Sequence, residues 1–252
     1  MHKSALITGG AKRIGAIIAQ HLARAGYHIA IHYHHSEEKA AETSASIQMI
    51  GQKTVMLSAD LRETSSLTQL VEKAHETIGP LTLLVNNASE FENDCVPDLN
   101  EELWEHHFST NLKAPVFLSQ AFARLLKREN RKGSIINIID QRVWRPTPQF
   151  FSYTLTKSAL WTATRTLAQA LAPDIRVNAV GPGPTLPSKR QSIDQFIQQN
   201  KALLLEKGSS PQDIAEAVLF LAQAESVTGQ MIAVDGGQHL AWETPDILGI
   251  TE

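Results

Sequence analysis

The stretch ITGGAKRIGAIIAQHL, which runs from Ile7 to Leu22, decides the fold class of this chain. A short apolar run ends at Ile7, a glycine turn follows, and apolar residues then recur at helical spacing from Ile14. Free N–H groups at a helix start attract phosphate, and glycine lets the backbone approach it closely. The stretch therefore predicts a strand, a phosphate-binding turn and a helix. Taken alone, it is also compatible with a glycine turn that binds nothing.

The same alternation of short apolar runs and longer helical patterns extends over the rest of the chain. Strands are predicted at Ser4–Thr8, His28–His32, Thr54–Leu57, Thr82–Val85, Ser134–Ile139, Ile175–Val180 and Gln230–Val234. Helices are predicted at Ile14–Ala25, Glu37–Ile50, Ser65–Ile78, Glu101–Lys127, Phe151–Leu171 and Pro211–Ala222. This order indicates an α/β fold, with a parallel sheet of seven strands covered by helices on both faces.

We interpret residues 1–252 as a single dinucleotide-binding catalytic domain. The region from Gly183 to Gly208 does not follow this alternation of strands and helices, because it begins with prolines and continues as a polar helix. We interpret it as an insertion that covers the substrate.

Composition and charge narrow the class of protein. Apolar residues make up 42% of the chain and charged residues 19%, which are ordinary values for a globular protein. The net charge of −3 argues against a nucleic-acid partner, and no apolar run is long enough for a membrane span. With a single cysteine, Cys95, and no recognisable export signal, we expect a cytoplasmic protein in which Cys95 is inert filler.

Polar groups fall where the predicted strands end. They are Thr8-Gly9, His34-His35-Ser36, Asp60, Asn86-Asn87, Asp140 and Gly181-Pro182-Gly183, in strand order. Open parallel sheets bind ligands along the edge formed by the carboxyl ends of their strands, near the point where strand order reverses. Six such groups on one edge predict a single long cofactor cleft.

The first two strands favour NADPH as the cofactor. The usual dinucleotide fingerprint is incomplete, because Arg13 occupies the position of the glycine expected between Gly9 and Gly15. An NAD site usually has an acid after the second strand, and His32 to Ser36 contain none. The groups predicted to hold a 2′-phosphate are Lys12, Arg13, His34, His35 and Ser36. A solvated loop remains an alternative for the histidines; a metal tract is another, although no pattern of cysteines or acids completes a metal site.

Tyr153 and Lys157 are the candidate reacting groups. They are four residues apart on a predicted helix, so both side chains lie on one face. A nearby ammonium stabilises a phenolate, and we expect Lys157 to lower the pKa of Tyr153 toward the working pH. Such a tyrosine exchanges a proton while a nicotinamide exchanges a hydride. An ordinary surface pair is the alternative, but the position after the fifth strand favours the catalytic interpretation.

These motifs together resemble the short-chain dehydrogenase/reductase family over nearly the whole chain. The matches are Thr8-Gly9 with Gly15, Asp60-Leu61, Asn86-Asn87-Ala88, Asn111, Tyr153 with Lys157, Pro182-Gly183, and Asp235-Gly236-Gly237. The resemblance implies a Rossmann-type, doubly wound sheet and a homotetramer. It also implies that Ile14, Leu61, Pro182 and Gly183 contact the cofactor, that Asp60 approaches the adenine, and that Asn86 to Ala88 line its pocket. By the same resemblance, Lys157 would hold the nicotinamide ribose and Asn111 would anchor a water that relays protons to Lys157.

One departure from the family narrows the resemblance. Most members have a serine where Asp140 stands, thirteen residues before Tyr153. A carboxylate there, together with TGGAKRIG and NNASEF, is similar to the pteridine reductases and bacterial dihydromonapterin reductases. That similarity implies that Asp140, Tyr153 and Lys157 act together on a reduced-pterin ring. It also implies that Phe91 stacks on the pterin, that Ser89 bonds its edge and that Arg13 reaches both phosphate and pterin. Packing for Phe91, a turn cap for Ser89 and a turn role for Asp140 remain open.

The sequence therefore predicts an NADPH-dependent reductase that transfers hydride to a C=N bond of a small, pterin-like molecule: a dihydropterin, dihydromonapterin or dihydrofolate. A short-chain carbonyl reductase or alcohol dehydrogenase is the first alternative. A non-catalytic NADP(H)-binding sensor is the second, although such a sensor needs neither Tyr153, Lys157 nor Asn111.

Overall fold

Seven parallel strands form one sheet in the computed structural model, which describes residues 3–188 and 190–244. The strands are β1 (Lys3–Ile7), β2 (Tyr27–Tyr33), β3 (Thr54–Ser58), β4 (Leu81–Asn86), β5 (Gly133–Ile138), β6 (Ile175–Pro182) and β7 (Met231–Val234). Their order across the sheet is β3-β2-β1-β4-β5-β6-β7. The chain therefore winds in opposite directions from β1 and from β4, so the switch point lies between these two strands.

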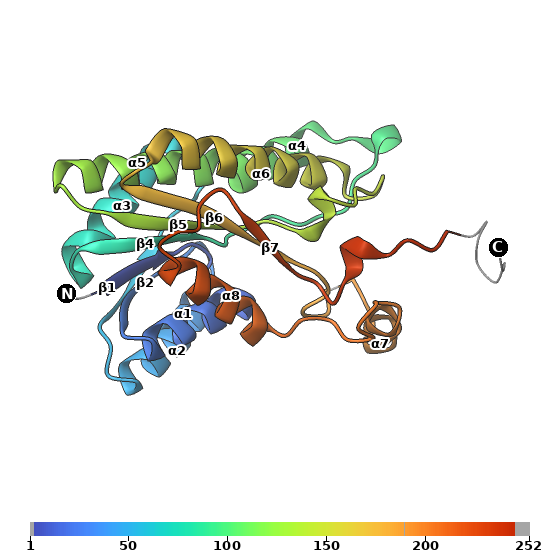
Figure 1. Cartoon of the computed structure of the whole chain (residues 1–252), viewed down its shortest axis with the longest axis horizontal. Helices are drawn as coiled ribbons and strands as arrows, with labels where there is room; N and C mark the ends of the chain where they lie inside the picture. Colours follow the sequence, from blue (N-terminus) through green and yellow to red (C-terminus); the bar gives the residue numbers. More distant parts are fainter. Residues whose placement is uncertain (1–2, 189, 245–252) are drawn as a thin grey trace.

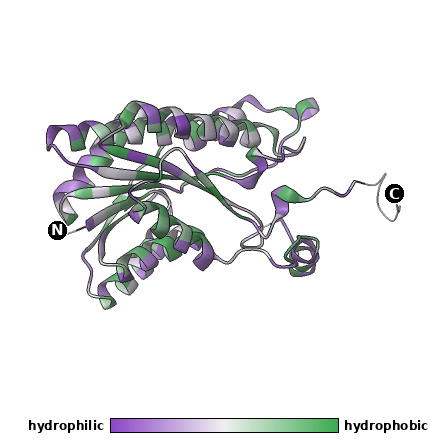
Figure 2. Cartoon of the chain, in the orientation of Figure 1, coloured by the Kyte–Doolittle hydropathy of each residue, from purple (hydrophilic) through white to green (hydrophobic). Residues whose placement is uncertain are grey.

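The sheet has helices on both faces because each strand directs successive apolar side chains to opposite faces. Ala5 and Ile7 of β1 belong to a buried cluster with α1 (Arg13–Arg24), α2 (Glu37–Met49) and α8 (Pro211–Gln223). Leu6 points the other way, into a cluster with α3 (Thr64–Ile78), α5 (Ala114–Arg128) and α6 (Phe151–Leu171). Figure 1 shows these two helical layers below and above the sheet. Figure 2 shows that hydrophobic colour gathers in the strands and on the inner helix faces. The predicted doubly wound α/β domain is confirmed.

The predicted elements agree with the observed ones to within a residue or two at each end, with one exception. The predicted helix Glu101–Lys127 is divided into α4 (Glu101–Phe108), a π-helical turn at Ser109–Lys113, and α5. The turn contains Asn111, which is completely buried and whose side chain bonds the backbone of Glu90. A π-turn shifts one residue out of the helical register, and such turns are frequent at functional sites.

The region 183–208, named here the covering segment, contains the polar helix expected from the sequence, α7 (Ile193–Lys201). Ser192 begins this helix with a reciprocal capping box to Gln195, which explains why a helix with no buried residue forms here. In Figure 1, α7 lies beyond the carboxyl ends of the strands, apart from the two helical layers. In the described part of the chain, no helix has the length and apolarity needed to cross a membrane.

Candidate active site

A large pocket runs along the carboxyl edge of the sheet, with a volume of about 1240 Å³. Pockets for one small ligand have ~300–1,000 Å³, so there is room for a dinucleotide and a substrate together. Its lining includes nearly every residue expected to contact a ligand: Gly9, Lys12, Arg13, Ile14, Gly15, His34, His35, Ser36, Asp60, Leu61, Asn87, Ala88, Ser89, Phe91, Asp140, Tyr153, Lys157, Pro182 and Gly183. The loops after the strands thus converge on one pocket, as their positions in the sequence indicated.

Asn86 and Asn111 lie outside that lining. The Asn86 side chain is buried and donates to Asn137 Oδ1 at 2.8 Å, which ties β4 to β5 inside the sheet. Asn111 Oδ1 accepts from the Glu90 N–H at 2.8 Å, and Asn111 Nδ2 donates to the Glu90 carbonyl at 2.9 Å. Asn86 therefore joins two strands, and Asn111 holds the Glu90 backbone while also bonding the hydroxyls of Ser89 and Thr156.

The glycine turn is packed against the loop that follows β4. Gly9 has a φ of +61°, and a Cβ on Gly15 would come within 2.2 Å of the Gly9 carbonyl oxygen. Asn87 Nδ2 donates to the carbonyls of Thr8 and Gly9, at 2.9 and 3.1 Å. Within the described chain, no side chain caps the N-terminus of α1, so its first N–H groups remain for a ligand anion.

Thr8, expected at this edge, and His32, whose role was not identified from the sequence, bond the turn and its neighbouring loop. Thr8 Oγ1 accepts from the N–H groups of Asn87 and Ala88, at 2.9 and 3.0 Å. His32 Nδ1 accepts from the Gly9 N–H at 3.1 Å, and burial lowers the pKa of His32 to about 4. An imidazole that is neutral at ordinary pH thus accepts a hydrogen bond from the turn. A histidine inside an otherwise apolar predicted strand is the sequence signal that could have identified it.

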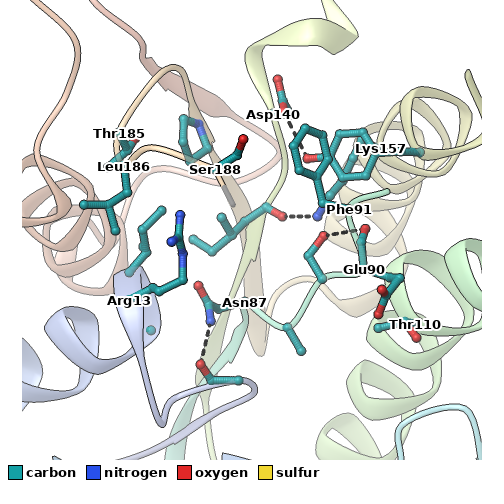
Figure 3. A pocket seen from close by; sticks show the side chains of 18 of the residues that line it. Arg13, Asn87, Glu90, Phe91, Thr110, Asp140, Lys157, Thr185, Leu186 and Ser188 are labelled. Carbon is teal, nitrogen blue, oxygen red and sulfur yellow. Dashed lines mark hydrogen bonds between the residues drawn. The ribbon is translucent and has the colours of Figure 1, made fainter. Parts of the chain in front are cut away.

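Arg13 stands at the turn in a left-handed backbone conformation, with a φ of +53°. Such a conformation is costly for a side chain larger than glycine. Its Nη2 donates to the Pro187 carbonyl at 3.3 Å, across the mouth of the pocket. Figure 3 shows Arg13 between Asn87 and the covering-segment residues Leu186 and Ser188.

The far end of the pocket contains the groups expected to bind the adenosine part. The rings of His34 and His35 lie 3.5 Å apart at their centroids, and His34 Nε2 is 3.8 Å from Asp60 Oδ2. Asp60 is bound by Arg62 through both carboxylate oxygens, with a shortest distance of 2.6 Å. Hydrogen bonds from Arg62 lower the pKa of Asp60 to about 2. Arg62 lines the pocket too and was missed, because it has no place in the motifs considered.

Asp140, Tyr153 and Lys157 come together at the other end. The Tyr153 hydroxyl donates to Asp140 Oδ2 at 3.0 Å, and Lys157 Nζ donates to the Ile138 carbonyl at 2.9 Å. Lys157 Nζ lies 5.6 Å from the centroid of the Tyr153 ring. Figure 3 shows Asp140 and Lys157 on the same side of the pocket as Phe91. The predicted grouping of a carboxylate, a phenol and an ammonium is present in the fold.

Burial dominates the protonation of this group. It raises the pKa of Asp140, and burial followed by the Asp140 charge raises the pKa of Tyr153 well above 10. Burial also lowers the pKa of Lys157 to about 8, against the attraction of Asp140. The expectation that Lys157 lowers the pKa of Tyr153 is wrong for this arrangement, because the phenol faces a carboxylate and is removed from water. Tyr153 is therefore held as a neutral donor.

The aromatic part of the pocket is larger than the sequence indicated. The Phe91 ring is parallel to Phe150, with centroids 4.5 Å apart, and meets the edge of Tyr153 at 4.6 Å. The guanidinium groups of Arg142 and Arg190 each lie within 5.5 Å of both phenylalanine centroids. Phe150, Arg142 and Arg190 were missed. Arg142 and Phe150 belong to the connection after β5 and Arg190 to the connection after β6, so only the fold brings them to Phe91, which follows β4.

Comparisons with known proteins identify the family of this chain. A family model described as enoyl-(acyl carrier protein) reductase matches residues 9–239. The chain is 31% identical to 3-oxoacyl-(acyl-carrier-protein) reductase of Staphylococcus epidermidis, over 95% of this chain and 100% of that one. Its fold superimposes on FolM alternative dihydrofolate reductase 1 of Brucella canis complexed with NADP, with a TM-score of 0.93 and 49% identity; the match covers 97% of this chain and 96% of that one. The Brucella suis protein, also in complex with NADP, matches with the same TM-score and identity over 96% and 97% of the two chains. The chain therefore belongs to the short-chain dehydrogenase/reductase family of oxidoreductases.

Proposed function

We propose that this protein is an NADPH-dependent reductase of a C=N bond in a dihydropterin-like substrate, such as a dihydropterin, dihydromonapterin or dihydrofolate. The observation that carries the proposal is the hydrogen bond from Tyr153 to the partly buried Asp140 carboxylate, inside the pocket that Phe91 lines. The likeness to the two Brucella proteins supports the same substrate class.

The residues present suit NADP. The uncapped α1 N-terminus offers N–H groups to a diphosphate, and Lys12, His34, His35 and Ser36 offer donors to a 2′-phosphate. At this end the Asp60 carboxylate is paired with Arg62, which reduces its repulsion of that phosphate. A bound NADPH would supply the hydride, and Lys157 would help to hold its ribose.

The chain's own groups would supply the proton. A substrate nitrogen gains the proton of the Tyr153 hydroxyl, and Tyr153 regains one from Asp140, whose raised pKa allows it to carry a proton. Asp140 is then reprotonated from solvent. An imine nitrogen must gain a proton during reduction, so a relay from a carboxylic acid suits this chemistry.

The covering segment would shield this chemistry from water. Several of its side chains line the pocket, and it is attached to the site through Arg13 and through Arg190, which bonds Glu92 and the Phe91 carbonyl. Exclusion of water strengthens electrostatic interactions in a site.

The test is NADPH oxidation with dihydrobiopterin, dihydromonapterin, dihydrofolate and a panel of ketones, each repeated with NADH. We expect turnover with at least one pterin or folate and weak turnover with ketones. Ketone reduction without pterin reduction would instead identify a carbonyl reductase, the candidate favoured by the likeness to 3-oxoacyl reductase. Tight NADPH binding without any turnover would identify a non-catalytic sensor.

A further inference from the structure

A buried chain of three polar side chains lies beside the catalytic tyrosine and outside the pocket lining. His107 and Ser152 are completely buried, and Asp94 is 6% exposed. His107 Nδ1 is 2.6 Å from Ser152 Oγ, and the Ser152 hydroxyl donates to Asp94 Oδ2. The Ser152 N–H also donates to the Asp94 carboxylate, at 3.2 Å from each oxygen. Three polar groups so deeply buried are costly unless each is bonded, so their arrangement is specific.

The direction of the hydrogen bonds defines the protonation of His107. The Glu92 backbone N–H donates to His107 Nε2 at 3.2 Å, and a backbone N–H can act only as a hydrogen-bond donor. Nε2 is therefore unprotonated, and the neutral ring carries its proton on Nδ1, where it donates to Ser152. Ser152 in turn donates to Asp94. Every donor in the chain from Glu92 to Asp94 thus meets an acceptor.

This chain joins three elements that surround the substrate pocket. His107 belongs to α4, Ser152 precedes Tyr153 on α6, and Glu92 and Asp94 belong to the loop after β4. That loop carries Phe91. On one side of Phe91, Asn111 holds the backbone of Glu90, and on the other side His107 holds the backbone of Glu92. Phe91 is therefore fixed between two anchored neighbours.

We propose that His107, as a neutral imidazole protonated on Nδ1, is a positioning residue that clamps the Phe91 loop to the catalytic helix. It touches neither substrate nor cofactor and acts through Phe91. The proposal rests on the proposed function only in so far as Phe91 contacts the substrate.

The clamp opens when His107 takes a second proton, because Nε2–H then faces the Glu92 N–H. The charged groups around the ring are Asp94 and Glu92 from the loop and His106 from α4, and the Tyr153 ring of α6 lies 6.2 Å away. Burial lowers the pKa of His107, Asp94 and Glu92 oppose that shift, and His106 adds to it. Because the folded-state pKa is below the ordinary value of about 6.5, the clamp's contribution is complete above that pH and is lost as the pH falls.

Two substitutions separate the two bonds of the ring. In His107→Asn the amide N–H replaces Nδ1 and keeps the bond to Ser152, but the acceptor for Glu92 is lost. In His107→Gln the amide oxygen reaches the place of Nε2 and keeps the Glu92 bond. We expect His107→Asn to raise the substrate KM about tenfold, with the NADPH KM nearly unchanged, and His107→Gln to restore much of the loss. In the wild type the substrate KM should rise on acidification, and in His107→Asn it should not.

A second readout needs no substrate. Nitrogen NMR of the wild-type His107 ring should show the Nδ1–H tautomer, and amide hydrogen exchange at Glu92 should accelerate as the pH falls. An Nε2–H tautomer, or slow Glu92 exchange at every pH, would overturn the clamp. So would an unchanged substrate KM in His107→Asn. If the wild type reduces no pterin, the proposed function fails, while the NMR and exchange results still decide the role of His107.

Discussion

At the scale of single residues, the three buried ionisable groups of the site each shift toward their neutral form. Asp140 and Tyr153 hold a proton more tightly than usual, and Lys157 holds one less tightly. Desolvation disfavours every charge. At Asp140 it is opposed first by Arg142 and then by Tyr153 and Lys157, and at Lys157 it is opposed by Asp140. The charge on Asp140 therefore influences the protonation of both Tyr153 and Lys157.

Asp140→Ser tests the carboxylate directly. For the proposed pterin reduction we expect kcat/KM to fall about 100-fold, because a serine in that place does not supply a proton to Tyr153. NADPH binding, measured by fluorescence, should be unchanged and serves as the control. Undiminished activity of the serine variant would favour a carbonyl reductase.

The lowered pKa of Lys157 predicts that activity falls at alkaline pH. Its pKa of about 8 lies below the ordinary 10.5, so the ammonium loses its proton in a range where an exposed lysine would keep it. We expect kcat/KM to fall as the pH rises through 8. Between a pH of about 8 and the ordinary pKa of 10.5, this lysine binds more protons in the unfolded chain than in the folded one. The free energy of unfolding therefore rises with pH in that range. Lys157→Arg should be slower, with its alkaline limb displaced above a pH of about 9. An activity profile of the wild type that stays flat beyond that pH would contradict the assignment.

We expect His34 and His35 to set the preference for NADPH over NADH. Replacing both with alanine should reduce kcat/KM for NADPH about tenfold and leave NADH nearly unaffected, because only NADPH carries the 2′-phosphate. His21→Ala, on α1 and outside the pocket lining, is the matched control. Equal losses with the two cofactors would assign the histidines to the solvated loop.

At the scale of elements, the site depends on helix ends. The π-turn brings Asn111 to the Phe91 loop, the α1 N-terminus faces the pocket, and Asp94 bonds the first turn of α6. Two other helices begin with side-chain caps. Ser210 and Asp213 form a reciprocal box at the start of α8, as Ser192 and Gln195 do on α7.

The two boxes make different predictions for stability. Ser210→Ala should lower the free energy of unfolding by about 1 kcal/mol, because α8 packs its buried face on α1. Ser192→Ala should have a smaller effect in urea unfolding, because α7 buries none of its residues and unfolds locally. Equal effects would mean that α7 unfolds with the core.

At the scale of the whole molecule, α4, α5 and α6 form one face of the chain (Figure 1). Phe117 on α5 and Leu155 on α6 are exposed there, although both are large and apolar. Exposed apolar side chains on neighbouring helices favour contact with another subunit.

We expect a homotetramer through this face. Light scattering should give four times the 27.7-kDa mass of the chain. The double variant Phe117→Glu and Leu155→Glu should give a smaller mass with an unchanged circular dichroism spectrum. A monomeric wild type would exclude the assembly.

The sequence by itself determined the alternation of elements and the edge at which the ligand groups gather. Apolar periodicity and glycine turns are local signals, and the carboxyl ends of parallel strands share an edge in any sheet of this class. Only the tertiary structure decided the shifted protonation of Asp140, Tyr153 and Lys157, the Phe91 and Phe150 stack between two arginines, and the chain from His107 to Asp94. These features depend on burial and on contacts between residues far apart in the chain, which no local pattern records.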